Sequence, residues 1–200
     1  MKHLIPLLLC LLMLIPASFV MIPLAIWVKL DSPGPVFYRA VRGGYKNQPF
    51  YIMKFRTMKM DAPSDVPTHL LENPEACITR VGKILRKTSL DELPQIFQIF
   101  TGEMSIIGPR PALWNQFDLI EERDKYGAND VVPGLTGWAQ INGRDELEIP
   151  VKAKLDGEYI EKFGLMMDIR CFFATFGILN GKGVVEGGTG ELHRQEQEKK

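Results

Sequence analysis

The sequence predicts an α+β protein that is mostly helical, carries a small β-hairpin and is attached to a membrane near its N-terminus. Residues 4–28 form an apolar run without a single charged side chain. Later segments repeat apolar residues at helical spacing, whereas the alternation typical of strands is confined to residues 36–55. A chain of 200 residues suffices for one domain with an appendage.

The composition excludes several classes of function. With 24 basic and 24 acidic residues, the net charge is zero, so no overall field attracts nucleic acid. The three cysteines lack metal-ligand spacing, and the three histidines are scattered, so neither a disulfide framework nor a zinc site is indicated. The glycine-rich fingerprints of nucleotide-binding loops are missing from the sequence.

The apolar run at residues 4–28 allows three interpretations. As one helix it would be about 37 Å long, enough to cross a hydrocarbon core of about 30 Å. A cleaved signal peptide is disfavoured because no clean cleavage site ends the run. A single span agrees with the basic residues that follow it. A re-entrant hairpin agrees with Pro16, followed by Ala17 and Ser18, which predicts a break. These residues leave span and hairpin open, and both place the remaining chain in the cytoplasm.

The next segments follow in order. Residues 36–38 and 49–55 are expected to pair as a hairpin around a turn at 42–44. Residues 61–76 are rich in proline and aspartate without periodicity, which predicts a loop. Residues 78–87 repeat apolar side chains at helical spacing opposite a basic face, which predicts an amphipathic helix.

The second half of the chain alternates short elements with turns. The pattern predicts a helix over 93–100, a strand stub at 105–107, a helix opening at Pro111, a turn-rich stretch at 133–144 and a helix over 150–163. Residues 168–179 are very apolar but too short to span a membrane, which leaves a core position and a position in the membrane interface open. Residues 180–200 are glycine-rich and then highly charged, as expected for a mobile tail.

The stretch TSLDELPQ at residues 88–95 combines two adjacent carboxylates with an expected helix start. Ser89 and Glu92 have the spacing of a capping box, in which Glu92 would only bond to the backbone of its own helix. The alternative is a phosphate-handling site, since a helix N-terminus favours anions and basic residues lie on both sides. These residues alone do not separate the two interpretations.

Asp91 suits chemistry at phosphorus. A carboxylate can attack phosphorus and hold a covalent phosphoryl intermediate, provided that Mg²⁺ or several cations neutralise the charge. Arg110 lies between two prolines that stiffen its backbone. The other candidate cations are Lys54, Arg86 and Arg144, although each alone is more typical of a solvated surface. A Mg²⁺ site of one or two carboxylates could be completed by Glu92, Asp156 or Asp168, although Asp168 is also placed to cap a helix.

Five motifs occur in order: KLDSPGPVFY, KFRTM, TSLDELPQ, GEMSIIGPRP and GLTGWAQINGR. Together they closely resemble the bacterial sugar transferase family, the small monotopic phosphoglycosyl transferases, over nearly the whole chain up to about residue 188. The resemblance implies an enzyme that transfers a sugar phosphate from a UDP-sugar to polyprenyl phosphate. It also implies that UMP is released, that Mg²⁺ is the cofactor and that the reaction takes place at the cytoplasmic face of the bacterial inner membrane.

The resemblance also implies residue roles. Asp91 is similar to the family's nucleophile, and Glu92 to its partner in an Asp-Glu dyad near Mg²⁺. The positions expected to bind phosphate or line the site are Lys54, Arg86, Arg110, Pro111 and Arg144. The carboxylates expected to hold the metal are Asp91, Glu92 and Asp156.

The family's membrane element is a re-entrant helix broken at a Ser-Pro pair, and this implies a hairpin broken near Pro16 and Ser18, although the pair itself is absent here. The expected organisation is a membrane hairpin at 1–30, a catalytic domain at 31–183 with interfacial amphipathic helices, and a tail at 184–200. Expected partners are the lipid bilayer, a second copy of the chain and other glycan-assembly enzymes, without nucleic acid. A non-catalytic membrane scaffold and a hydrolase that uses water as acceptor are the rival functions.

Overall fold

The computed structural model describes residues 4–62, 74–143 and 147–179. These residues form a mixed α/β structure that is mostly helical, as predicted. The chain divides into two compact units, of which the first comprises residues 1–40 and 51–101 and the second comprises residues 41–50 and 102–200. The predicted division at residues 30 and 183 stays a prediction.

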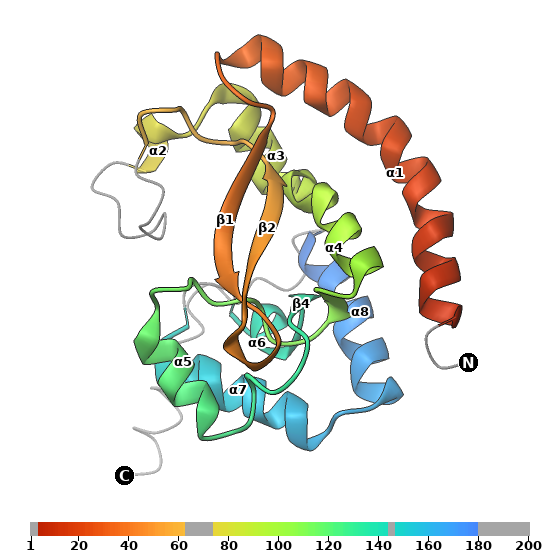
Figure 1. Ribbon diagram of the computed structural model, residues 1–200, viewed down its shortest axis with the longest axis vertical. Helices are drawn as coiled ribbons and strands as arrows, with labels where there is room; N and C mark the ends of the chain where they lie inside the picture. Colours follow the sequence, from red (N-terminus) through yellow and green to blue (C-terminus); the bar gives the residue numbers. More distant parts are fainter. Residues whose placement is uncertain (1–3, 63–73, 144–146, 180–200) are drawn as a thin grey trace. The chain divides into compact units, whose positions relative to one another are not determined.

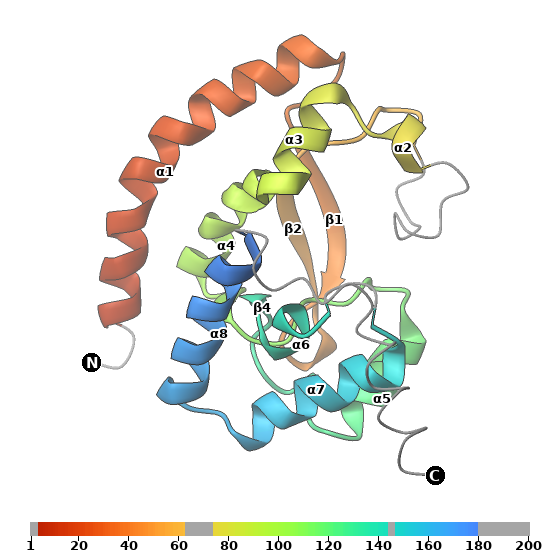
Figure 2. The same ribbon diagram turned by 180° about the vertical axis from the view of Figure 1, so that it is seen from behind.

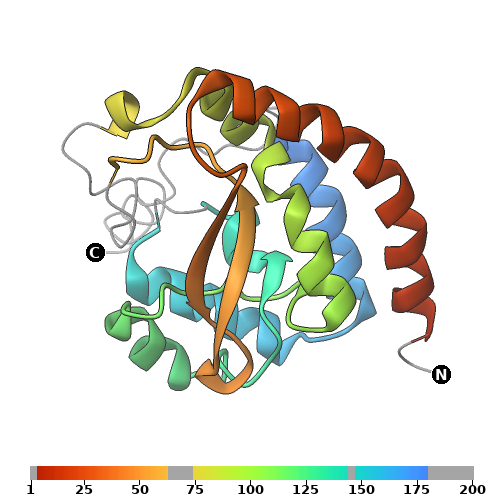
Figure 3. The same cartoon turned by 45° about the horizontal axis from the view of Figure 1, so that its top comes forward.

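The N-terminal helix α1 (Leu4–Asp31) continues through both Pro16 and Pro23. The expected break at Pro16 and Ser18 is therefore not seen. Figure 3 shows α1 as one curved ribbon. A proline removes one backbone donor and crowds the preceding turn, which bends a helix whose other hydrogen bonds persist. Within the described ranges, no helix has both the length and the apolar character required to cross a membrane.

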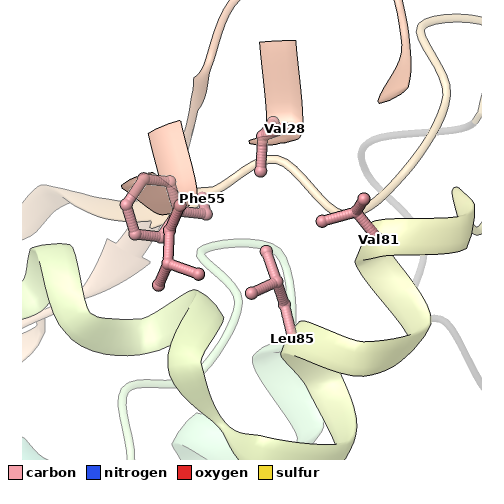
Figure 4. Close-up of a cluster of buried hydrophobic side chains, with 5 residues drawn as sticks. Val28, Phe55, Val81 and Leu85 are labelled. Atoms are coloured by element: carbon pink, nitrogen blue, oxygen red, sulfur yellow. The ribbon is translucent and has the colours of Figure 1, made fainter. Parts of the chain in front are cut away.

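One face of α1 contributes to the core of the first unit. Leu24 and Val28 pack with Phe55, Val81 and Leu85, all of which are buried. Figure 4 shows four of these side chains pointing toward one another. The helices α3 (Arg80–Thr88) and α4 (Ile96–Thr101) lie beside α1 in Figures 1 and 2. Burial of this apolar surface holds α1 against the rest of the first unit.

The other face of α1 is apolar and exposed. Phe19, Ile22 and Leu30 are 73%, 62% and 79% exposed. Trp27 and Ile26 are also exposed on this helix. Large apolar patches on a surface mark contacts with a membrane or another protein.

The predicted hairpin is present. It consists of β1 (Phe37–Gly43), the 3₁₀ turn η1 (Tyr45–Asn47) and β2 (Pro49–Phe55) (Figure 1). Lys46 and Asn47 have φ angles of 52° and 57° in this turn. The first strand is longer than the expected range 36–38, since it continues to Gly43.

The basic helix α3 begins at Arg80, two residues later than the sequence pattern indicated, because Ile78 forms a bridge with Met58. Its start is capped twice. The side chain of Thr79 accepts a hydrogen bond from the amide of Gly82 at 2.9 Å. The side chain of Asp31 accepts one from the amide of Val81 at 3.0 Å. Two of the amides that a helix start leaves without backbone partners are thereby bonded. A Cβ on Gly82 would lie 2.1 Å from the carbonyl oxygen of Thr57, so glycine is required there.

The helices near the carboxylate pair are short. The helix α2 (Pro74–Cys77) precedes α3, and the 3₁₀ helix η3 (Leu90–Gln95) connects α3 to α4. The predicted helix over residues 93–100 therefore begins as a 3₁₀ turn and becomes α-helical only at Ile96.

In the part of the second unit that the structure describes, a small parallel sheet packs with four helices. Strand β3 (Ser105–Ile107) pairs in parallel with β4 (Gly134–Thr136), with Ser105 opposite Gly134. The helices are α5 (Phe117–Asp124), α6 (Trp138–Ile141), α7 (Ile149–Glu161) and α8 (Leu165–Leu179). Figure 2 shows α5 and α6 lying against α7.

The helix expected to open at Pro111 begins only at Phe117. The intervening residues instead pair with the hairpin. Gly43 donates its amide to the carbonyl of Ala112 at 3.1 Å, and Arg42 forms a bridge with Leu113. These bonds commit the backbone to an extended path, which outweighs the preference of proline for a helix start.

Helix α8 has one buried and one exposed face. Met167 and Cys171 pack with Tyr159 of α7. Leu165 and Phe173 are 77% and 68% exposed. The structure therefore places one side of this apolar segment in the core and leaves the other uncovered.

Candidate active site

The carboxylate pair lies in η3, immediately after α3 ends. Ser89 adopts a left-handed conformation with φ at 57° and makes no side-chain capping bond. The amide of Glu92 bonds to the carbonyl of Ser89 at 3.2 Å. The predicted capping box is therefore wrong: in the left-handed conformation Ser89 closes α3 rather than opening a helix with its hydroxyl. Asp91 is 8% exposed.

The side chain of Glu92 reaches strand β2 instead. The Nζ of Lys54 lies 2.7 Å from Oε1 of Glu92, and the two side chains are 18% and 16% exposed. A hydrogen bond between charged groups in a half-buried place is stronger than one in open water. The pair thus orients Glu92 in the turn that also carries Asp91.

Arg86 forms the basic side of this cluster. Its Nε donates to Oγ1 of Thr57 at 2.8 Å. Burial lowers the pKa of Arg86, and the negative charge of Asp91 opposes that shift. Because Asp91 acts on the charge of Arg86, the two groups are coupled electrostatically. The first unit therefore brings together Lys54, Arg86 and both carboxylates, and their roles in a site stay a prediction.

Arg110 and Pro111 lie in the second unit, between β3 and α5. The Nη1 of Arg110 donates to the carbonyl of Leu135 at 3.1 Å. Pro109 and Pro111 are buried, while Arg110 is half-buried. A small depression in this unit is lined by Arg110 and by Gly43 and Asn47 near the tip of the hairpin.

Asp156 has a different environment from the one expected of a metal ligand. Its Oδ2 accepts hydrogen bonds from Nε and Nη2 of Arg123 at 2.8 Å and 2.6 Å. Both side chains are almost completely buried. Burial raises the pKa of Asp156, and Arg123 opposes the rise. Asp156 is thus the ion-pair partner of Arg123 through Oδ2, and its expected role as a metal ligand stays a prediction.

Sequence reasoning missed Arg123 and Thr57. Thr57 belongs to KFRTM, but no chemistry distinguished its hydroxyl in the sequence. Arg123 occupies the inward side of α5, near Leu119, where a charged residue interrupts the apolar pattern. That interruption was the one available signal. The candidate Arg144 lies outside the described residues.

The carboxylates of Asp91 and Glu92 are candidate ligands for Mg²⁺. Within the described ranges, no group of three or more His, Cys, Asp or Glu residues is placed to hold a metal ion. Mg²⁺ in phosphate chemistry is commonly bound by one or two carboxylates together with substrate phosphates and water. Asp91 and Glu92 supply hard oxygen donors of this kind, so the donor set fits the ion.

The fold and the carboxylate cluster agree with the result of comparison with known proteins. The chain belongs to the bacterial sugar transferase family, whose model matches residues 1–182.

Several known proteins are similar to this chain. The chain is 42% identical over 171 residues to the UDP-glucose:undecaprenyl-phosphate glucose-1-phosphate transferase of Escherichia coli (strain K12), covering 82% of this chain and 37% of that protein. It is 38% identical over 148 residues to the uncharacterized sugar transferase EpsL of Bacillus subtilis (strain 168), covering 74% and 71%. A UDP-N-acetylgalactosamine-undecaprenyl-phosphate N-acetylgalactosaminephosphotransferase of Aeromonas hydrophila is 38% identical over 174 residues, covering 83% and 40%. The chain thus spans less than half the length of the first and third relatives.

Proposed function

We propose that this protein is a phosphoglycosyl transferase that moves a sugar-1-phosphate from a UDP-sugar to polyprenyl phosphate and so initiates a membrane-linked glycan. The observation that carries the proposal is the cluster in the first unit. There Asp91 and Glu92 lie with Arg86 and Lys54 in a chain of the bacterial sugar transferase family. Two relatives are named as enzymes that transfer a sugar phosphate to undecaprenyl phosphate.

The proposed reaction has two steps. A carboxylate oxygen of Asp91 attacks the β-phosphorus of the UDP-sugar, and the bond from that phosphorus to the bridging oxygen breaks to release UMP. An oxygen of polyprenyl phosphate then attacks the phosphorus of the aspartyl phosphosugar. The acyl-phosphate bond breaks, the lipid diphosphate sugar leaves and the Asp91 carboxylate is regenerated.

The neighbouring residues support these steps through charge. Arg86 offsets the negative charge that gathers when a carboxylate approaches a phosphate, and Lys54 holds Glu92 in place. By resemblance, Arg110 and Arg144 bind substrate phosphate. Asp91 and Glu92 would hold Mg²⁺, which when bound neutralises phosphate charge.

We further propose that α1 anchors the protein in the bacterial inner membrane as a re-entrant element, with the catalytic part on the cytoplasmic face. The exposed apolar face of α1 supports contact with lipid. A Lys2→Cys variant in intact cells tests the topology. Labelling of this cysteine only after permeabilisation of the inner membrane agrees with a re-entrant element, whereas labelling from the periplasm contradicts it.

The activity is tested by release of UMP from a panel of UDP-sugars, with and without polyprenyl phosphate. UDP-glucose and UDP-N-acetylgalactosamine come first because of the relatives' names. We expect turnover to require the lipid phosphate and Asp91→Asn to abolish it, while the control Asp118→Asn, at an exposed position, retains it.

Two results would contradict the proposal. Turnover by Asp91→Asn at the wild-type rate would show that Asp91 is not the nucleophile. Release of UMP that is independent of polyprenyl phosphate would indicate a hydrolase. Isolation of a sugar phosphate bound to Asp91 from the wild-type protein would establish the covalent step.

A further inference from the structure

Arg123 uses its buried guanidinium to join two parts of the second unit. Its Nε and Nη2 donate to Oδ2 of Asp156 at 2.8 Å and 2.6 Å. Its Nη1 donates to the main-chain carbonyl of Arg110 at 2.9 Å. Arg123 is only 2% exposed and Asp156 is fully buried. A charged pair is costly to bury, and the third hydrogen bond gives the buried guanidinium a main-chain partner as well.

The segment around Arg110 has little regular structure of its own. Three of its carbonyls accept hydrogen bonds from three different elements. The carbonyl of Pro109 bonds to the amide of Gly134 at 2.9 Å, and that of Ala112 bonds to the amide of Gly43 at 3.1 Å. The carbonyl of Arg110 lies between them and is bonded to Arg123. The path of this segment is therefore set by its surroundings, and Arg123 supplies the side-chain contact at its centre.

We propose that Arg123 is a positioning residue that holds the backbone of Arg110 so that the Arg110 guanidinium is presented to substrate phosphate; this inference rests on the proposed function. Asp156 orients Arg123 by engaging two of its N–H groups. The planar fork of a guanidinium can serve a carboxylate and a carbonyl at once, whereas a lysine ammonium lacks that fixed geometry. Arg123 thus acts through Arg110 and does not itself contact the substrate.

A double-mutant cycle tests this coupling in the full-length protein. The kcat and KM for the UDP-sugar are measured in the wild type, Arg123→Lys, Arg110→Ala and the double variant. We expect Arg123→Lys to lower kcat/KM about tenfold in the wild-type background and to have almost no effect once Arg110 is alanine. An equal factor in both backgrounds would overturn the inference, because a general loss of structure acts independently of Arg110.

A matched control is available in the first unit. Arg56 is 4% exposed and donates hydrogen bonds to the carbonyls of Pro33 and Ser32. Arg56→Lys therefore also weakens the hydrogen bonds from a buried arginine to the main chain. We expect the effect of Arg56→Lys to be the same in the wild-type and Arg110→Ala backgrounds. Loss of that effect in the Arg110→Ala background would mean that Arg110 masks any structural damage, and the inference would fail.

Amide hydrogen exchange separates the inference from the proposed function. We expect exchange in residues 108–116 to rise at least severalfold in Arg123→Lys and to stay unchanged in Arg56→Lys. Unchanged exchange in Arg123→Lys would overturn the inference even if the enzyme is active. Absence of UMP release from the wild-type protein would instead overturn the proposed function, and the catalytic part of this inference with it.

Discussion

Lys54 in strand β2 and Glu92 in η3 form a half-buried ion pair, with Nζ 2.7 Å from Oε1. The two residues are 38 positions apart in the sequence. This pair connects the hairpin to the turn that carries Asp91, and it assigns Glu92 to a partner other than the start of its own helix.

The Lys54–Glu92 pair leads to a first prediction. Lys54→Met removes one partner and leaves a half-buried carboxylate, which should lower the free energy of unfolding by about 1–2 kcal/mol. Because Glu92 loses its orientation, turnover should fall as well. Chemical denaturation and UMP release measure the two effects.

The exposed pair between Lys83 and Glu75 is the control for Lys54→Met. Its side chains are 53% and 71% exposed. Lys83→Met should change stability by about 0–1 kcal/mol and leave turnover unaffected. Equal destabilisation by the two lysine variants would show that burial does not strengthen the Lys54 pair.

The core of the first unit leads to a second prediction, tested on adjacent residues of α3. Leu85 is completely buried, whereas Ile84 is 46% exposed. Leu85→Ala should destabilise the protein by about 2–5 kcal/mol because it leaves a cavity between α1 and α3. Ile84→Ala should cost less than about 1 kcal/mol. Similar unfolding midpoints for the two variants would contradict the packing of Leu85.

The buried pair of the second unit leads to a third prediction. Asp156→Asn leaves the Arg123 guanidinium buried without its anion, which should cost about 3–5 kcal/mol. The control is Glu122→Gln, whose partner Lys125 is exposed and one helical turn away, with an expected change of about 0.5 kcal/mol or less. Thermal unfolding compares them. An Asp156→Asn protein that is as stable as the wild type but needs a higher Mg²⁺ concentration for turnover would favour the metal role of Asp156 predicted from the sequence.

The thiol of Cys171 leads to a fourth prediction. Burial raises its pKa to about 11 from the ordinary value of 9.0. A raised thiol pKa means that the reactive thiolate is scarcer at any pH below it, here by about a hundredfold at pH 8. Cys171 should therefore resist alkylation in the folded protein and react after denaturation.

Cys77 serves as the comparison for Cys171, since it is only half-buried. We expect Cys77 to be alkylated first at pH 8, and mass spectrometry of the alkylated peptides identifies each site. Alkylation of Cys171 as fast as Cys77 in the folded protein would contradict the burial of α8 against Tyr159.

The hairpin, the amphipathic helix α3 and the adjacent carboxylates could be predicted because they depend on neighbouring residues. Alternation over 49–55 and helical spacing over 78–87 report which side of an element faces the core. The sequence also named Lys54 and Arg86 as candidate cations near Asp91 and Glu92, since phosphate chemistry requires positive charge. The pairing of Lys54 with Glu92 could not be predicted, because no local pattern connects these two residues.

The wrong predictions arose where a local signal was outweighed by distant contacts. Pro111 indicated a helix start, but Gly43 engages the carbonyl of Ala112 and keeps the segment extended. Ser89 and Glu92 had capping spacing, but Ser89 turned out to close α3. At Pro16 no break is seen in α1, and the re-entrant arrangement stays a proposal.

The sequence by itself determined the family of this protein, its hairpin and the residues proposed to carry its chemistry, because these follow from residue type, spacing and order along the chain. Only the tertiary structure decided the partner of each charge: Lys54 for Glu92, Thr57 for Arg86 and Arg123 for Asp156. The physical reason is desolvation. A charge removed from water requires a counter-charge or hydrogen bond at contact distance, and that distance is set by the packing of elements far apart in sequence.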